Sequence, residues 1–227
     1  MSIVVQTLSE RICEIVREQI VSGKLPEDVP IRQDSLASEL GVSKIPLREA
    51  LVRLEQEGLL VSQANRGYFV QGMSSEQAEE IFALRLAIEP QAAAYGCRSA
   101  SEEDRDRAGL AYKELEAAPE GDPVGAAVRN RDFHTALVRP GEKLLTTQLV
   151  EKLAVLAERY VIAHLKPTGR DARARLEHRG LFNAWMARDA RQVEKLLKAH
   201  IRGTLEDLRA QFASQGELRP PSGSRES

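Results

Sequence analysis

The sequence predicts a mainly α-helical protein in two parts: three short helices with a β-hairpin, then an all-helical antiparallel bundle. Two observations carry this prediction. Apolar residues recur at helical spacing over most of the 227-residue chain, and only residues 59–71 contain short β-like runs. Aromatic residues make up only 4% of the chain, which fits helical packing better than a β sandwich.

Composition excludes several classes of protein. Hydrophobic residues at 42% argue against a disordered chain, and no uncharged apolar run approaches the roughly 18 residues that span a bilayer. Charged residues interrupt the N-terminal segment, so no signal peptide is expected. Cys13 and Cys97 share no metal or redox spacing, and we expect reduced thiols in a cytoplasmic protein without membrane contact. The net charge of −2 counts mildly against a general nucleic-acid binder.

The first part is expected to contain three helices followed by the hairpin. Thr7 and Glu10 form a capping-box pattern, in which each side chain meets a backbone amide that lacks a helical partner. Gly41 and Ser43 separate the second helix from the third, because glycine adopts the special turn conformation and serine caps the helix that follows. The expected helices are 7–22, 33–40 and 44–57, and the expected β-like runs are 59–63 and 67–71.

From Ser74 the pattern changes to long amphipathic helices with no further strand signal. Proline, glycine and capping residues separate these helices. The expected helices begin with 74–97 and continue with 101–115, 124–138, 143–165, 171–187 and 190–213. The domains expected from the whole pattern are a first domain at 1–72, a hinge at 73–76, a helical domain at 77–213 and a disordered polar tail at 214–227.

The two short helices around Gly41 form the pattern of a helix–turn–helix. Lys44 and Arg48 lie four residues apart and share one face at the start of the second helix, where such proteins contact base edges and phosphates. Arg66 and Gly67 lie at the hairpin tip, where a wing reaches a neighbouring groove. An ordinary three-helix bundle with solvated basic residues explains the spacing equally well.

The identities of the residues are more informative than their spacing. The stretch LASELGVSKIPLREALVRLEQEGLL, followed by NRGYFV, closely resembles the winged helix–turn–helix of GntR-family bacterial transcription regulators, over most of residues 8–70. The resemblance implies that Ser43, Lys44 and Arg48 contact operator phosphates and guanine edges. It also implies that the backbone of Gly67 approaches the minor groove.

Other positions near the start of the third expected helix match the family pattern less closely or lie outside it. Arg32 lies just before the second helix and is a candidate phosphate contact. Lys44 replaces the usual arginine, so a two-pronged guanine contact is not expected there. Asp34 stands where some members carry a phosphate-binding arginine, and that contact is not carried over. Residues 1–73 hold eight Lys or Arg and ten Asp or Glu, so the basic residues near the face stand in an acidic background.

Three of the four histidines lie in separate predicted helices: His134, His178 and His200. Imidazoles that converge from three helices suit a divalent metal, and Asn130 lies on the same helical face as His134. From spacing alone, three half-buried histidines with local hydrogen bonds are the more economical interpretation.

The neighbouring segments resemble a second known domain. LRLAIEPQAAAYG, NRDFHTALV and LEHRGLFNAWMARDARQVEKLLKAHI are similar to the FCD ligand-binding domain of the FadR subfamily, over about residues 77–205. The resemblance implies an FCD-like bundle in which Asn130, His134, His178 and His200 hold a divalent metal such as zinc or nickel. Many members have aspartate at the first position, and the neutral Asn130 offers only an amide oxygen, which weakens the site for a hard cation.

The same resemblance implies a small carboxylate effector beside the metal, and Arg85 is a candidate to pair with it. The alternative is an internal ion pair between Arg85 and Glu89, four residues further on.

The leading hypothesis is a homodimeric, ligand-responsive repressor that binds a palindromic operator in double-stranded DNA. A second hypothesis is a metal-dependent hydrolase that uses the three histidines, but no catalytic motif accompanies them, and Glu177 is expected to point away because it adjoins His178. A third keeps DNA binding, with a metal that is structural or absent.

Overall fold

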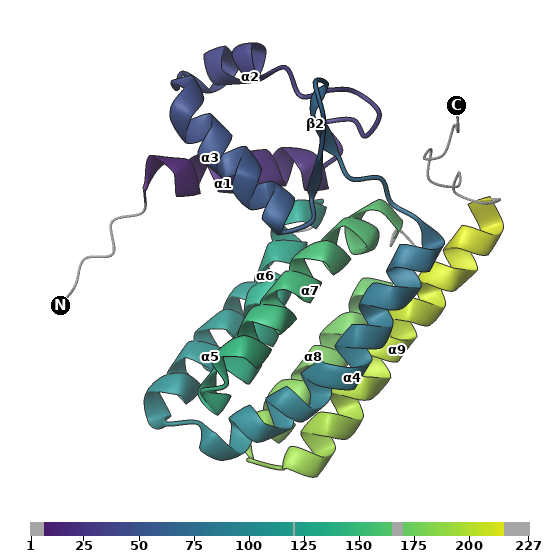
Figure 1. The fold of residues 1–227 in the computed structure, drawn as a ribbon. Helices are drawn as coiled ribbons and strands as arrows, with labels where there is room; N and C mark the ends of the chain where they lie inside the picture. The colour runs from purple at the N-terminus through teal and green to yellow at the C-terminus, as the bar shows by residue number, and fades with distance from the viewer. Residues whose placement is uncertain (1–6, 120, 165–169, 216–227) are drawn as a thin grey trace. The chain divides into compact units, whose positions relative to one another are not determined.

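A computed structural model describes residues 7–119, 121–164 and 170–215. It confirms the predicted fold class, a mainly helical chain with one antiparallel hairpin (Figure 1). The chain divides after Gly72 into two compact units, and each unit is described by itself.

The first unit contains three helices and a hairpin with the bounds α1 Leu8–Val21, α2 Gln33–Leu40, α3 Lys44–Gln56, β1 Leu60–Gln63 and β2 Gly67–Val70. The capping box of Thr7 and Glu10 forms as predicted. Gly41 has a φ of 65°, the left-handed conformation that lets the chain turn between α2 and α3. Leu47 and Leu51 of α3 are fully buried, and α3 packs against α1. The core therefore fixes α3 from behind and leaves its other face in solvent.

Ser43 differs from the prediction in one respect. It occupies the position before α3, but its side chain makes no capping hydrogen bond to the helix amides. Its hydroxyl is exposed at the start of α3 instead.

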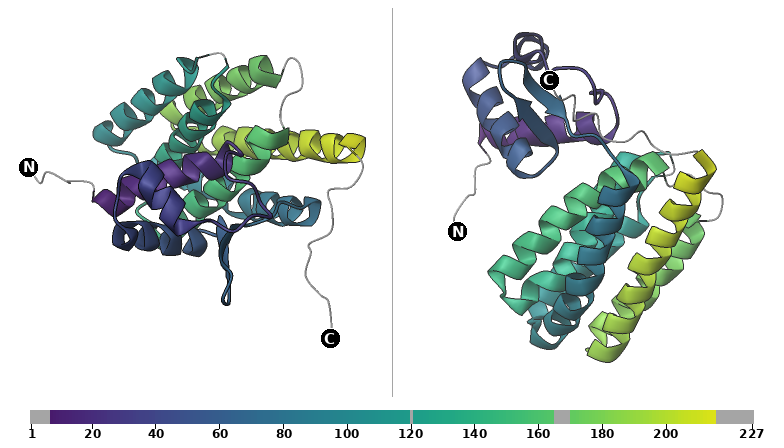
Figure 2. Two further views of the ribbon diagram at one scale, coloured as in Figure 1. Left: turned by 90° about the horizontal axis from the view of Figure 1, so that it is seen from above. Right: turned by 45° about the vertical axis from the view of Figure 1, so that its right-hand side comes forward.

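The second unit is a bundle of helices with the bounds α4 Ser75–Ser99, α5 Glu102–Glu116, α6 Pro123–Val138, α7 Leu144–His164, α8 Arg170–Met186 and α9 Ala190–Gln215. A short 3₁₀ turn, η1, covers Arg139–Gly141. Helix α4 packs against α6, α7 and α9, and Figures 1 and 2 show α4 and α9 side by side. The core of this unit lies around α4, where Phe82 is fully buried, together with Phe133 and Trp185.

A glycine lets α4 and α6 approach closely. A Cβ atom added to Gly96 would lie 2.2 Å from the carbonyl oxygen of Leu137, which no side chain tolerates without a backbone shift. The indole nitrogen of Trp185 donates to the same carbonyl at 3.1 Å, as expected for a core tryptophan. The close approach of the two backbones and the hydrogen bond from the indole together fix the end of α6.

Two predicted boundaries differ from the structure. The hinge was expected at 73–76, but α4 already begins at Ser75, with the Ser74 side chain accepting from the Gln77 amide. The tail was expected from 214, but α9 runs to Gln215, and residues 216–227 lie outside the described residues. Within the described residues, no helix combines the length and the apolar character needed to cross a membrane.

Candidate DNA-binding face and metal centre

The start of α3 presents a polar, cationic face. Ser43, Lys44 and Arg48 are all exposed. The first turn of α2 holds both cations: the Lys44 ammonium lies 2.6 Å from a carboxylate oxygen of Asp34, and Nε of Arg48 donates to the side-chain oxygen of Gln33 at 3.1 Å. The amides at the start of a helix favour an anion, so this face is suited to phosphate oxygens.

The hairpin supplies a second group of candidate contacts. Arg66 is exposed in the turn between the strands, and its guanidinium lies 5.2 Å from the centre of the Phe69 ring. Gly67 is the first residue of β2, and Arg32 is exposed just before α2. These residues belong to elements separate from α3, as expected for a wing and a flanking contact.

Sequence reasoning missed Ile45, which follows Lys44 and is 72% exposed. An aliphatic side chain at the start of a recognition helix can contact the methyl group of thymine. The signal was present in the sequence, because Ile45 lies outside the buried stripe of Leu47, Leu51 and Leu54.

In the second unit the structure brings the three predicted histidines together. His134 comes from α6, His178 from α8 and His200 from α9, and all three are buried. One ligand atom from each ring lies within 4.8 Å of the corresponding atoms of the other two. The ring centres of His178 and His200 are 4.6 Å apart, and those of His134 and His200 are 5.3 Å apart.

Two carboxylates hold these rings from behind. Nδ1 of His134 lies 2.7 Å from Glu89 of α4, and Nδ1 of His200 lies 2.7 Å from Glu177 of α8. An ionised carboxylate only accepts hydrogen bonds, so each Nδ1 carries the proton and donates it. Each Nε2 then has a lone pair available for a metal. The Nε2 atom of His134 is buried and has no hydrogen-bond partner among the described residues.

The electrostatics agree with this protonation. Burial by itself would raise the pKa of Glu89, but the Arg85 guanidinium and the His134 hydrogen bond outweigh it and hold that pKa below its usual range. Burial lowers the pKa of His200, against the opposing effect of its hydrogen bond to Glu177. A neutral imidazole with a protonated Nδ1 is the form that binds a metal, so the residues present fit a borderline divalent ion.

Sequence reasoning missed the role of both carboxylates. Glu89 entered only as a partner of Arg85, and Glu177 was expected to point away from the histidines because it adjoins His178. Glu177 does leave the face of His178, but it reaches His200 on the neighbouring helix α9. Only the packing of α8 on α9 reveals this contact.

Arg85 and Asn130 lie beside the histidines. Arg85 is buried and makes a two-pronged ion pair with Glu89, at 2.8 and 3.2 Å, which is the internal pair that their four-residue spacing offers. Arg85, Asn130 and His134 also line one small cavity of about 20 Å³, together with Arg131 and Glu158. That volume holds about one water molecule, so the described state of this cavity has no room for an organic ligand.

An exposed helix start with a hairpin beside it, joined to a helical bundle with a candidate metal centre, is the arrangement of a DNA-binding protein of the winged-helix type with a separate helical domain. Known proteins agree with this description. The family model for bacterial regulatory proteins of the gntR family matches residues 8–70, and the FCD domain model matches residues 80–203. The chain therefore belongs to the GntR-type transcription regulators with an FCD domain.

Individual relatives span nearly the whole chain. The HTH-type transcriptional regulator BphR of Paraburkholderia xenovorans strain LB400 is 30% identical over 215 residues, with 90% of this chain and 86% of BphR covered. The HTH-type transcriptional repressor GlaR of Escherichia coli K12 is 28% identical, with 82% of this chain and 89% of GlaR covered. Among solved structures, E. coli McbR/YncC matches with a TM-score of 0.78 at 20% identity, over 92% of this chain and 100% of that chain, which supports the fold.

Proposed function

We propose that this DNA-binding transcription regulator is a cytoplasmic, ligand-responsive repressor that binds a palindromic operator as a homodimer. The observation that carries the proposal is the exposed start of α3, where the Ser43 hydroxyl, Lys44 and Arg48 stand beside the helix amides. A two-fold dimer would present two such faces to the two halves of an operator.

We assign a divalent metal, zinc or nickel, to the three histidines. In such a site the metal would supply a Lewis-acidic position for an anionic group. The chain's own residues prepare that position: Glu89 and Glu177 fix the orientation of the His134 and His200 rings. The Asn130 side chain lines the cavity that His134 also lines and is the candidate for a further, weaker ligand.

We assign the effector to the class of small carboxylates. Two arginines, Arg85 and Arg131, are among the residues that line the cavity beside His134. Each is already paired with a carboxylate, Arg85 with Glu89 and Arg131 with Glu158 at 3.2 Å. An effector carboxylate would therefore replace one of these internal partners, and the small cavity would widen as it entered. Such an exchange gives the effector a differential affinity for two states of the domain, as regulation requires.

The metal-dependent hydrolase gains no support from the site. Glu89 and Glu177 engage the Nδ1 atoms of His134 and His200, so neither of these carboxylates stands on the Nε2 side as a general base. Relatives across the whole chain are transcription regulators.

Retardation of a short duplex from the region upstream of the encoding gene is the expected result in a gel shift at low salt. Addition of a panel of small carboxylic acids to the zinc-loaded or nickel-loaded full chain should then change the retardation for one chemical class. A chain that retards none of the upstream duplexes at low salt would contradict the proposed function.

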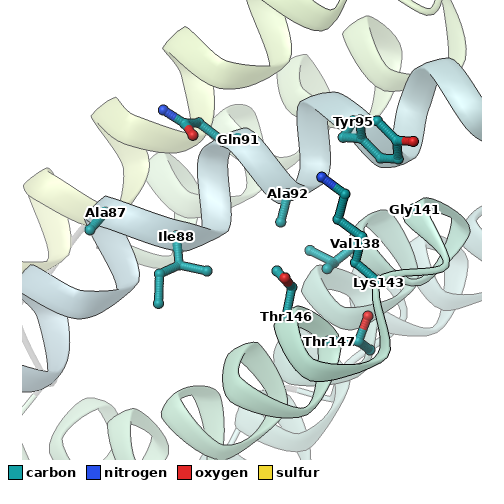
Figure 3. A pocket seen from close by; sticks show the side chains of 10 residues that line it. All are labelled: Ala87, Ile88, Gln91, Ala92, Tyr95, Val138, Gly141, Lys143, Thr146 and Thr147. Atoms are coloured by element: carbon teal, nitrogen blue, oxygen red, sulfur yellow. The ribbon is translucent and has the colours of Figure 1, made fainter.

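For the homodimer we assign the face formed by α4 and the start of α7. A groove of about 250 Å³ lies between them (Figure 3). Ile88, Ala92 and Tyr95 line it from α4, and Thr146 and Thr147 line it from α7. Exposed aliphatic side chains from the same two helices are Leu84, Leu144, Leu145 and Leu149. Monomeric proteins rarely leave so many large apolar groups together in water.

The charges at the ends of this face suit a second copy of the chain. Residues 144–150 carry no charged side chain, whereas Lys143 and Glu151 bracket them. Two copies of α7 that cross antiparallel about a two-fold axis near Thr147 would bring Lys143 of each copy toward Glu151 of the other, where it would join the pair that Glu151 makes with Arg139 at 2.8 Å. A two-fold interface is self-complementary in this way.

The Leu145→Ala substitution is expected to raise the dimer dissociation constant about tenfold, because two copies of a 71% exposed leucine lose apolar contact. Sedimentation over a range of concentrations measures the effect. Leu110→Ala on α5, which removes a 59% exposed leucine elsewhere, is the matched control. Equal dissociation constants for the two variants would show that the face is assigned wrongly.

A further inference from the structure

An acidic residue occupies the predicted DNA-contact face. Asp34 lies in the first turn of α2, its side chain is 77% exposed, and its carboxylate meets the ammonium of Lys44, the first residue of α3. The pair thus joins the two helices of the helix–turn–helix on their solvent side. Because both side chains are solvent-exposed, the pair contributes little to folding, and its position calls for another explanation.

The two cations at the start of α3 are held differently. Arg48 donates to Gln33, a neutral acceptor, and keeps its full charge. Lys44 is paired with the carboxylate of Asp34, and the two opposite charges together add no net charge to the face. Gln33 and Asp34 are neighbours in the first turn of α2. Gln33 leaves the charge of Arg48 uncompensated, whereas Asp34 offsets the charge of Lys44.

This difference matters because the sequence-independent part of DNA affinity depends on how many phosphates a protein neutralises. A phosphate has to compete with the Asp34 carboxylate for the Lys44 ammonium, and a phosphate bound there also meets the negative charge of that carboxylate. Base contacts are affected less, since the uncharged edge of guanine is not repelled by the carboxylate, and a carboxylate also accepts from the amino group of cytosine.

We propose that Asp34 is a specificity-determining residue: by holding Lys44, it lowers the affinity for DNA of any sequence more than the affinity for the operator. This inference rests on the proposed operator binding. It accounts for an acidic side chain at a surface that otherwise suits phosphate.

The test compares Asp34→Asn with the wild-type full chain. The DNA probes are a duplex selected by the wild type from a random pool and a scrambled duplex of the same composition. Fluorescence anisotropy over a range of salt concentrations measures both affinities. In the variant, affinity for the scrambled duplex is expected to rise about threefold to tenfold, with a salt slope steeper by about 1, because Lys44 becomes free to neutralise one phosphate. Affinity for the selected duplex should rise less, so the ratio of the two affinities falls.

Glu39→Gln is the matched control. Glu39 lies at the other end of α2, is also exposed and pairs with Lys24 at 2.9 Å, so the variant makes the same charge change away from α3. Equal shifts in Asp34→Asn and Glu39→Gln would reduce the effect to net charge and overturn the inference. So would an unchanged affinity ratio in Asp34→Asn.

The wild type separates this failure from that of the proposed function. If the wild type selects no duplex over the scrambled one, operator binding fails and the inference falls with it. If the wild type keeps its preference and Asp34→Asn keeps the same ratio and slope, only the inference fails. Thermal unfolding of each variant by circular dichroism confirms that the affinities are those of folded protein.

Discussion

Addition of zinc or nickel to metal-stripped protein is expected to raise the free energy of unfolding by about 3 kcal/mol when free metal exceeds its dissociation constant about a hundredfold. For a chain of this length the midpoint of thermal unfolding should rise by about 10 °C. The reason is that the three histidines converge only in the folded bundle, so binding energy becomes folding energy. In His134→Ala the same addition should produce little or no shift.

The comparison depends on the metal-dependent shift and not on absolute stability, because removal of the buried His134 ring also leaves a cavity. Elemental analysis of the purified wild type and of His134→Ala gives an independent measurement. A wild type with no metal above the background of the variant would show that the histidines form a packed polar cluster instead.

Glu177→Gln provides a graded variant within the same experiment. It keeps all three histidines but replaces the carboxylate that accepts from Nδ1 of His200. Loss of such a partner weakens metal affinity about tenfold to a hundredfold in comparable sites. An unchanged affinity in Glu177→Gln would mean that the ring is oriented by packing alone.

Local sequence patterns were sufficient to predict the helices because their ends are encoded locally. Thr7, Ser101 and Asp122 each cap the helix that follows through a side chain three residues from its bonded amide. These contacts depend only on neighbours in the chain, so they can be inferred without the tertiary structure. Ser43 fits the same pattern but makes no such bond, which shows that a capping residue defines the helix start without fixing the hydrogen bond.

The metal candidates could be named in advance, but their supporting carboxylates could not. Glu89 is 45 residues from His134 in the chain, and Glu177 is 23 residues from His200. Which carboxylate meets which ring depends on the rotation of α4 and α8 against their neighbours. The close approach permitted by Gly96 helps to set that rotation, and no periodicity in the sequence reports it.

For Arg85, the sequence offered two roles and could not choose between them. The four-residue spacing correctly offered an ion pair with Glu89, and the family resemblance offered an effector contact. The structure shows the ion pair and also places Arg85 at the cavity beside His134. The two roles of Arg85 are compatible if the effector displaces Glu89 from it. The spacing of residues in the sequence cannot predict such an exchange of partners.

Replacement of Arg48 with alanine is expected to weaken operator binding about tenfold to a hundredfold and to relax the sequence preference at one base pair, the cost of losing a two-pronged guanine contact. Arg48 is the cation at the start of α3 that keeps its charge, because its partner Gln33 is neutral. Arg48→Lys should recover only part of the affinity, since an ammonium is a point donor without the planar fork of guanidinium. Titration of the wild-type-selected duplex and of single-base variants of it measures both effects.

Arg53→Ala separates a specific contact from a general charge effect. Arg53 lies in the last turn of the same helix, is about half exposed and pairs with Glu10 at 3.4 Å, so it removes the same charge at the opposite end of α3. If α3 enters the major groove by its first turn, Arg48→Ala loses affinity and base preference together, whereas Arg53→Ala changes affinity by less than about threefold. Equal losses in the two variants, with the base preference intact, would place the reading surface somewhere other than the start of α3. Loss of the base preference in Arg48→Ala alone would instead assign base recognition to Arg48, the cation of α3 whose partner, Gln33, is neutral.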